Sequence, residues 1–310
     1  MMSTDQTLDS PSLAPQNAGV RRRHGLRPLF GAMRAALQWR LMLWWTVLLL
    51  LPTLVASLPV WQMLGASLDH SVHAPQLAQK LDMLAIADLI GSARDRFGAA
   101  IGSGGIVALA LTLLLSPLLA GMTIHAARAA KRPGFIDLLA GGAQEYARMF
   151  RMLVWSAFPL LVVGIVAGVA FKVAGKSAES AILESDAERA SHIALAVTAL
   201  AFVLVHATID AGRALLANER RRRSAIVAWW GGVRLMIRRP LTLLGVYVIV
   251  TGAGLVIAAL LALARLHVPA IGAGGTAAAF LLTQLAVLVL GWMRSARLFA
   301  MMALVRARPQ

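Results

Sequence analysis

The sequence predicts an all-α, polytopic membrane protein, with six transmembrane helices arranged as three repeated hairpins and cytoplasmic interfacial amphipathic helices. Three observations support this fold class. Of the 310 residues, 59% are hydrophobic and only 14% are charged, whereas a typical soluble domain has about 25% charged residues. Apolar runs of about 20 residues, the length that spans a bilayer, recur along the chain. The basic residues, which give a net charge of +16, gather between these runs.

The N-terminal part precedes the first span. Residues 1–25 are polar, contain Ser, Pro and Gln, and end in arginines, so we expect a disordered basic tail. Residues 26–40 carry apolar side chains at helical spacing with arginines interspersed, which predicts an amphipathic helix on the cytoplasmic surface. Residues 41–64 form the first span, in which Pro52 and Pro59 predict a kink. This run is too long, and too far from the N-terminus, for a cleaved signal.

The other elements follow in a regular order. Residues 65–103 form the longest connection, whose leucines and isoleucines predict a partly amphipathic external helix. A second interfacial helix is expected at residues 135–150, and a third amphipathic stretch ends at Arg239, before Pro240 opens the fifth span. The predicted second to sixth spans are residues 104–124, 152–170, 192–209, 241–264 and 274–293.

The basic residues predict the orientation of these spans. With the N-terminus inside, 23 of the 30 Lys and Arg residues fall in cytoplasmic segments, and every external connection is poorer in them than its neighbours. This bias is what the positive-inside rule describes. We therefore expect a multi-pass protein of the bacterial inner (cytoplasmic) membrane with both termini in the cytoplasm. The Ala-, Leu- and Arg-rich usage suggests a bacterium of high genomic GC content.

A short motif marks a threefold internal repeat. Each even-numbered span ends with two small residues and an arginine, and these arginines are 85 and 84 residues apart: Arg128, Arg213 and Arg297. Each odd-numbered span follows an amphipathic stretch that ends in arginine. The unit is thus an interfacial helix, a span, an external loop, a span and an arginine. Residues 26–308 are predicted to be a single domain, with repeats at about 26–132, 133–223 and 224–308.

With this unit in place, the chain resembles a loose group of bacterial multi-pass proteins that includes the membrane portion of some glycerophosphodiester phosphodiesterases. The resemblance rests on amphipathic lead-ins and on a charged residue followed by small residues and arginine, as in the segment from Asp210 to Arg213. It extends over residues 26–308 in pattern only. The catalytic barrel of those enzymes has no counterpart in these residues, so the resemblance does not imply their activity.

Asp210 is the one acid that borders a predicted span, and His206 lies on the same helical face. His125, Asp210 and Arg294 occupy equivalent repeat positions, so pseudo-symmetry could bring them together as a charged cluster at an inner mouth. Such a cluster would be a structural lock or a proton- or ion-sensitive gate. The alternative is that Asp210 pairs with Arg213 or with an arginine of another repeat.

The arginines are expected to fix topology and to contact anionic lipid headgroups. This interpretation covers the repeat arginines, Arg128, Arg213 and Arg297, and a run of four between the fourth and fifth spans, Arg220, Arg221, Arg222 and Arg223. Nucleic acid is not an expected partner, because these charges flank membrane spans. The expected partners are membrane phospholipids; a membrane protein or further copies of this chain are additional candidates.

Catalytic and metal-binding signatures are missing from the sequence. The chain has no cysteine, which excludes disulfides, Cys-ligated metals and thiol nucleophiles. His70, His73, Asp69 and Asp82 could hold a metal, but their spacing matches no ligand signature. No nucleotide-binding, hydrolase or metalloprotease motif is present. We therefore expect no catalytic residue, no metal and no cofactor, and a protein that is not an enzyme.

Two functions remain open from the sequence. The first is binding or movement of a hydrophobic or lipid-like solute between the hairpins, favoured by the repeat, the prolines within spans and the basic rim. The second is a membrane scaffold or assembly factor for other membrane components, favoured by the scarcity of polar groups within the spans. A lipid-lined internal space would favour the first function, and a tightly packed bundle with a flat exposed face would favour the second.

Overall fold

The computed structural model describes residues 26–68, 83–180, 183–219, 224–269 and 272–307. In this part of the chain the regular structure is α-helical, and no strand occurs, which confirms the predicted fold class. Among the described residues, six helices are long and apolar enough to cross a membrane. The elements are α1 (Leu26–Ala35), α2 (Trp39–Leu68), α4 (Met83–Arg128), α5 (Phe135–Glu179), α6 (Glu184–Asn218), α7 (Ala225–Arg238), α8 (Pro240–Leu266) and α9 (Gly272–Arg306).

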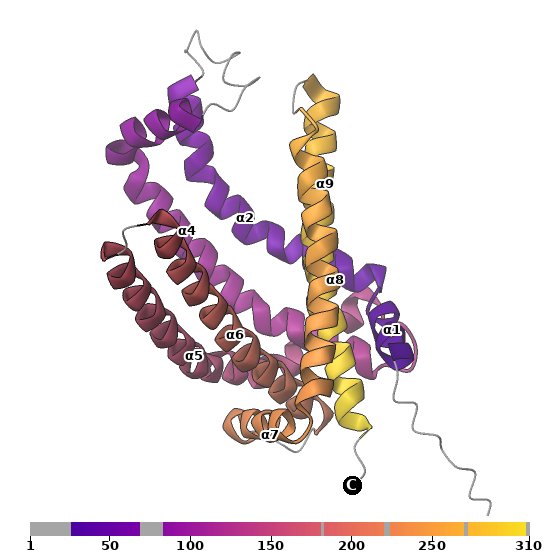
Figure 1. The fold of residues 1–310 in the computed structure, drawn as a ribbon. Coiled ribbons are helices and arrows are strands. Elements are labelled where there is room, and N and C mark those ends of the chain that lie inside the picture. Colours follow the sequence, from indigo (N-terminus) through magenta and orange to yellow (C-terminus); the bar gives the residue numbers. More distant parts are fainter. Residues whose placement is uncertain (1–25, 69–82, 181–182, 220–223, 270–271, 308–310) are drawn as a thin grey trace, which may run out of the picture.

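The six long helices pair as three hairpins of consecutive elements, α2 with α4, α5 with α6, and α8 with α9. Figure 1 shows that the three hairpins converge at the end of the molecule where α1 and α7 lie, and spread apart toward the opposite end. We call the end where the hairpins converge the arginine-rich end, because the repeat arginines lie there, and we call the opposite end the outer end. The three hairpins thus diverge from one common contact region.

Two helices are longer than the sequence indicated. The segment 135–150, expected as a separate surface helix, is the start of α5, which runs without a break to Glu179. The helix expected in the first external connection is continuous with the second span in α4. Neither junction contains a proline to interrupt the backbone hydrogen bonds. By contrast, α7 ends at Arg238 and α8 begins at Pro240, because the missing backbone N–H of proline needs no partner in a first helical turn.

The helical segments that precede the three hairpins are α1, the start of α5, and α7. Their contacts form a closed ring at the arginine-rich end. The start of α5 packs against α4, α7 packs against α6, and α1 packs against α9. The last contact joins the first described helix to the last one: the Trp292 indole Nε1 of α9 donates a hydrogen bond to the Met33 carbonyl oxygen of α1 at 3.0 Å. Each lead-in thus covers the second helix of the preceding hairpin in a cyclic order. The repeat boundaries themselves stay a prediction.

Glycines make two of these crossings possible. A Cβ atom on Gly121 of α4 would lie 2.7 Å from the Gly142 carbonyl oxygen of α5. A Cβ atom on Gly232 of α7 would lie 2.4 Å from the Thr208 carbonyl oxygen of α6. Real Cβ atoms do not approach so closely, so the small residues set the distance between these helices. The Trp229 indole then reaches the Thr208 hydroxyl at 3.2 Å.

The buried side chains gather in two clusters at the arginine-rich end. One surrounds the last two turns of α6 and includes Met152, Leu216 and Met301. The other lies between α1, α2, α4 and α9 and includes Leu41 and Met122. Toward the outer end, most large apolar side chains are exposed, as expected for helices that face lipid. Packing between hairpins is therefore concentrated at one end.

Candidate functional site

Asp210 lies in the middle of the converging helices, near the C-terminal end of α6. Its side chain is 7% exposed. One carboxylate oxygen, Oδ1, accepts a hydrogen bond from Arg213 Nη1 at 3.0 Å, one helical turn away. The other oxygen, Oδ2, forms an ion pair with Arg297 Nε of α9 at 2.5 Å. Asp210 therefore joins the second and third hairpins through a buried charge pair.

The third hairpin adds polar partners from α8. Arg297 Nη1 donates a hydrogen bond to the Thr251 hydroxyl at 3.2 Å, and its guanidinium lies 4.8 Å from the centre of the Tyr247 ring. The Tyr247 hydroxyl is 3.2 Å from His206 Nδ1, and this nitrogen is 3.6 Å from Asp210 Oδ2. These residues and Arg294 form what we call the Asp210 cluster: His206, Asp210 and Arg213 of α6, Tyr247 and Thr251 of α8, and Arg294 and Arg297 of α9.

The depth of this cluster follows from helix geometry. With a rise of about 1.5 Å per residue, Arg294 lies about 33 Å along α9 from Gly272 at the outer end. The hydrocarbon core of a bilayer is about 30 Å thick. The Asp210 cluster thus lies near the boundary between hydrocarbon and headgroups on the arginine-rich side. Charges are much less costly at this level than at the bilayer centre.

Arg294 differs from the other members because its side chain is exposed. It is close enough to Arg297, Arg213 and Asp210 to interact with them electrostatically. Within the described part of the chain, no ion pair or hydrogen bond joins it to another residue. Its neighbours in sequence are buried, Met293 against Gly254 of α8 and Ser295 beside Thr123 of α4. Arg294 therefore points into a direction that no helix covers.

The direction can be worked out from the contacts of α9. Successive residues are about 100° apart around a helix. Gly291, which touches Trp45 of α2, and Arg297, which touches Asp210 of α6, are therefore each about 60° from Arg294, on opposite sides. Arg294 consequently faces between the α2–α4 hairpin and the α5–α6 hairpin. We call this side the inward face of α9, and it continues toward the outer end as Leu290, Val287, Thr283 and Phe280.

A second polar network holds the end of α6. The Glu145 carboxylate of α5 accepts hydrogen bonds from Arg128 Nη1 at 2.5 Å and from Arg148 Nη1 at 2.7 Å. Both arginines also donate to carbonyl oxygens at the end of α6. Arg128 donates to Ala217 in the last turn, and Arg148 donates to Leu216 and to Glu219, the residue that follows the helix. These carbonyls have no partner within the helix and carry the negative end of its dipole, so the guanidiniums stabilise the helix end. These contacts favour a structural role for the network.

The cluster expected from the repeat is present only in part. His206, Asp210, Arg213, Arg294 and Arg297 lie together, whereas His125 is directed at Gly141 of α5, where an added Cβ would be 2.2 Å from its ring. The run from Arg220 to Arg223, the N-terminal tail, and the loop residues Asp69, His70, His73 and Asp82 lie outside the described residues. In the described ranges, no group of three acidic or histidine side chains could hold a metal ion.

Three residues of these networks were not expected from the sequence: Tyr247, Glu145 and Arg148. Tyr247 lies four residues before Thr251 on one face of a predicted span, which was the available signal for Tyr247. Glu145 is the one acid near the middle of a segment assigned to the membrane surface. Arg148 follows Glu145 at helical spacing, which was the available signal for this pair.

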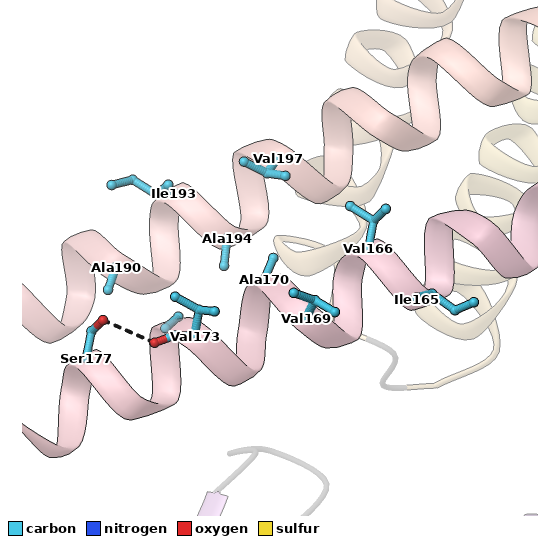
Figure 2. Close-up of a pocket in the computed structure, with 11 residues that line it drawn as sticks. Ile165, Val166, Val169, Ala170, Val173, Ser177, Ala190, Ile193, Ala194 and Val197 are labelled. Atoms are coloured by element: carbon cyan, nitrogen blue, oxygen red, sulfur yellow. Dashed lines mark hydrogen bonds between the residues drawn. The ribbon is translucent and has the colours of Figure 1, made fainter.

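An apolar groove of about 560 Å³ runs between α5 and α6 toward the outer end (Figure 2). Figure 2 shows the side chains of Val169, Ala170 and Val173 from α5 opposite Ala190 and Ala194 from α6. Of its lining residues only Ser177 is polar, and the Ser177 hydroxyl donates to the Val173 carbonyl oxygen at 3.1 Å. The alanines leave space beside the valines, and the surface of the groove is therefore almost entirely apolar.

The fold and the site together define a class: six apolar helices indicate an integral, multi-pass membrane protein. Comparison of the chain with protein-family models, with curated proteins and with solved structures finds no match.

Proposed function

We propose that this protein binds or moves a hydrophobic or lipid-like solute between its hairpins, and that it is not an enzyme. The proposal rests above all on one observation: the inward face of α9 is exposed although it points between the other two hairpins. Phe280 is 55% exposed and Leu290 is 37% exposed on this face. In a bundle whose hairpins were packed along their whole length, such residues would be buried.

The pattern of burial supports the same proposal. The contacts between different hairpins, such as Trp45 with Gly291 and Asp210 with Arg297, lie at the arginine-rich end. In the outer half, Ala174 and Ala194 are buried between the two helices of a single hairpin. The hairpins therefore part toward the outer end, and apolar side chains line the diverging faces. Such surfaces take up hydrocarbon, because water would be excluded from them.

Lipid analysis tests this function directly. The protein is extracted in native membrane patches, transferred to mild detergent, and the lipid that remains bound is quantified. Leu290→Trp would fill space on the inward face and should lower the amount retained. Leu285→Trp is the matched control, since Leu285 is 47% exposed on the opposite side of the same helix. Equal retention by both variants and the unsubstituted protein would contradict the proposal.

The second function, a scaffold or assembly factor, is favoured by the same exposed faces, which a helix of another membrane protein could also cover. A stoichiometric protein partner, lost in Leu290→Trp and retained in Leu285→Trp, would support it. For the location we propose a bacterial inner membrane with both termini in the cytoplasm. The support for this orientation is the concentration of Lys and Arg residues on one side of the spans.

A further inference from the structure

The charges of the Asp210 cluster are unequal. Three guanidiniums, those of Arg213, Arg294 and Arg297, meet one carboxylate, that of Asp210. Arg297 is 8% exposed, forms an ion pair with Asp210 and donates a hydrogen bond to Thr251. Arg213 is 23% exposed and uses Nη1 on Asp210. Arg294 is exposed and unpaired in the described part of the chain. The unbalanced positive charge is therefore accessible at Arg294.

The surroundings of Arg294 restrict what can neutralise it. On the inward face of α9, the next turns toward the outer end present Leu290, Val287 and Phe280, with Thr283 as the one polar side chain. Phe202 of α6 is 43% exposed and lies beside His206 of the cluster, with ring centroids 5.3 Å apart. A ligand at Arg294 would thus have an anionic group at one end and apolar surface beside the rest of its length.

The depth of Arg294 agrees with this arrangement. It lies about 33 Å from the outer end of α9, at the level where the phosphates of one leaflet meet hydrocarbon. Guanidinium groups bind phosphate through paired, charge-assisted hydrogen bonds. An acyl chain extending from this level toward the outer end would run along the inward face of α9.

We infer that the solute held between the hairpins is an anionic, phosphate-bearing lipid, with its headgroup bound by Arg294 and the exposed side of Arg213. This inference rests on the proposed function and adds to it the charge class of the ligand and the residues that select it. Asp210 holds the guanidinium of Arg213 in position, and its ion pair with Arg297 fixes α9, the helix that carries Arg294, against α6. The apolar inward face of α9 binds the acyl chains. The other exposed arginines at the arginine-rich end contact lipid headgroups from outside the bundle, whereas Arg294 binds a headgroup from between the hairpins.

The test measures lipid retention by native mass spectrometry of the full chain reconstituted in nanodiscs that contain equal amounts of phosphatidylglycerol and phosphatidylcholine. The unsubstituted protein should retain phosphatidylglycerol preferentially. Arg294→Gln should lower this preference by about tenfold, the scale of one charge-assisted hydrogen bond. Arg294→Lys should keep most of the preference. Arg238→Gln is the matched control, because Arg238 is an exposed arginine of α7 at the same end, and it should leave the preference unchanged.

The possible outcomes separate this inference from the function on which it rests. If both lipids are retained equally and Arg294→Gln has no effect, the headgroup assignment is overturned while lipid binding stands. If no lipid is retained above the level of Leu290→Trp, the proposed function fails as well. If Arg238→Gln reduces the preference as much as Arg294→Gln, any exposed arginine at the arginine-rich end has this effect, and the assignment to Arg294 is wrong.

A final arm distinguishes a lipid from a soluble anion. Inorganic phosphate is added at millimolar concentration during the retention measurement. A lipid ligand should stay bound, because its acyl chains contribute most of the attraction. Displacement of phosphatidylglycerol by phosphate, or binding of phosphate that depends on Arg294 but not on Leu290, would assign the site to a soluble phosphate compound and overturn the lipid assignment.

Discussion

Asp210→Asn is the substitution that should most weaken the packing of the second hairpin against the third. Asparagine keeps the size of the side chain and removes its charge. The guanidinium of Arg297, which is buried, and that of Arg213, which is 23% exposed, would then lose the carboxylate that neutralises them. Removing one partner of a buried ion pair costs about 3–5 kcal/mol. A Coulomb estimate at an effective dielectric constant of about 20 gives about 4 kcal/mol for charges about 4 Å apart, which agrees.

The assay is equilibrium unfolding of the purified protein in mixed micelles with increasing denaturing detergent. Asp210→Asn should lower the free energy of unfolding by about 3–5 kcal/mol. Asp186→Asn is a matched control on the same helix. Asp186 is 52% exposed and lies 3.6 Å from the exposed Arg189, so this change should cost less than about 1 kcal/mol.

A double-mutant cycle then tests the pairing itself. Combining Asp210→Asn with Arg297→Gln removes both charges, and the loss should be smaller than the sum of the single losses by at least about 1 kcal/mol. Additive losses would show that Asp210 and Arg297 do not interact. A loss below about 1 kcal/mol for Asp210→Asn alone would refute the reasoning that this ion pair holds the hairpins together.

Three further predictions follow from other parts of the structure. Gly232→Ala should lower the free energy of unfolding by about 1–3 kcal/mol, because the added Cβ would lie 2.4 Å from a backbone oxygen of α6. Gly245→Ala is the control: a Cβ at this position would have no atom within 4 Å, so the free energy of unfolding should stay unchanged or rise slightly. Glu145→Gln should cost about 3 kcal/mol in the same assay, since two arginines lose their buried counter-charge, and an unchanged midpoint would contradict a structural role. The chain contains no cysteine, so single cysteines can be introduced for labelling with a membrane-impermeant maleimide. A cysteine at Ser180 should react from the periplasmic side, and a cysteine at Ser224 should react from the cytoplasmic side. Labelling of both from one side would overturn the topology.

The spans and their pairing were predictable from the sequence, because both depend on local properties. Runs of apolar residues determine which segments can span a membrane, and short connections make consecutive spans neighbours. The boundary at Pro240 was equally local. The continuous course of α5 through residue 150 was not expected, since an amphipathic segment and an apolar one can belong to a single helix when no residue breaks it. Amphipathicity describes the surroundings of a segment and leaves its backbone continuity open.

The partners of Asp210 were predictable only in part. Arg213 follows from helical spacing within α6. The pairing with Arg297 depends on how α9 is rotated against α6, and the sequence contains no direct measure of that rotation. Equivalence of repeat positions favoured Arg294 and His125 instead. In the structure, Arg294 lies about 60° around the helix from Arg297 and His125 is turned toward α5. Whether the cluster also acts as a gate stays a prediction.

The central claim is that the three hairpins are joined at the arginine-rich end and open to lipid between their outer halves. Oxygen accessibility of spin labels on α9 in a lipid bilayer tests it most directly. Labels at Phe280 and Thr283 report on the inward face, and a label at Leu285 reports on the opposite side, which faces lipid. The structure predicts similar oxygen accessibility at all three positions. Strong protection of Phe280 and Thr283 with high accessibility at Leu285 would show that the hairpins close on each other, which would contradict the claim.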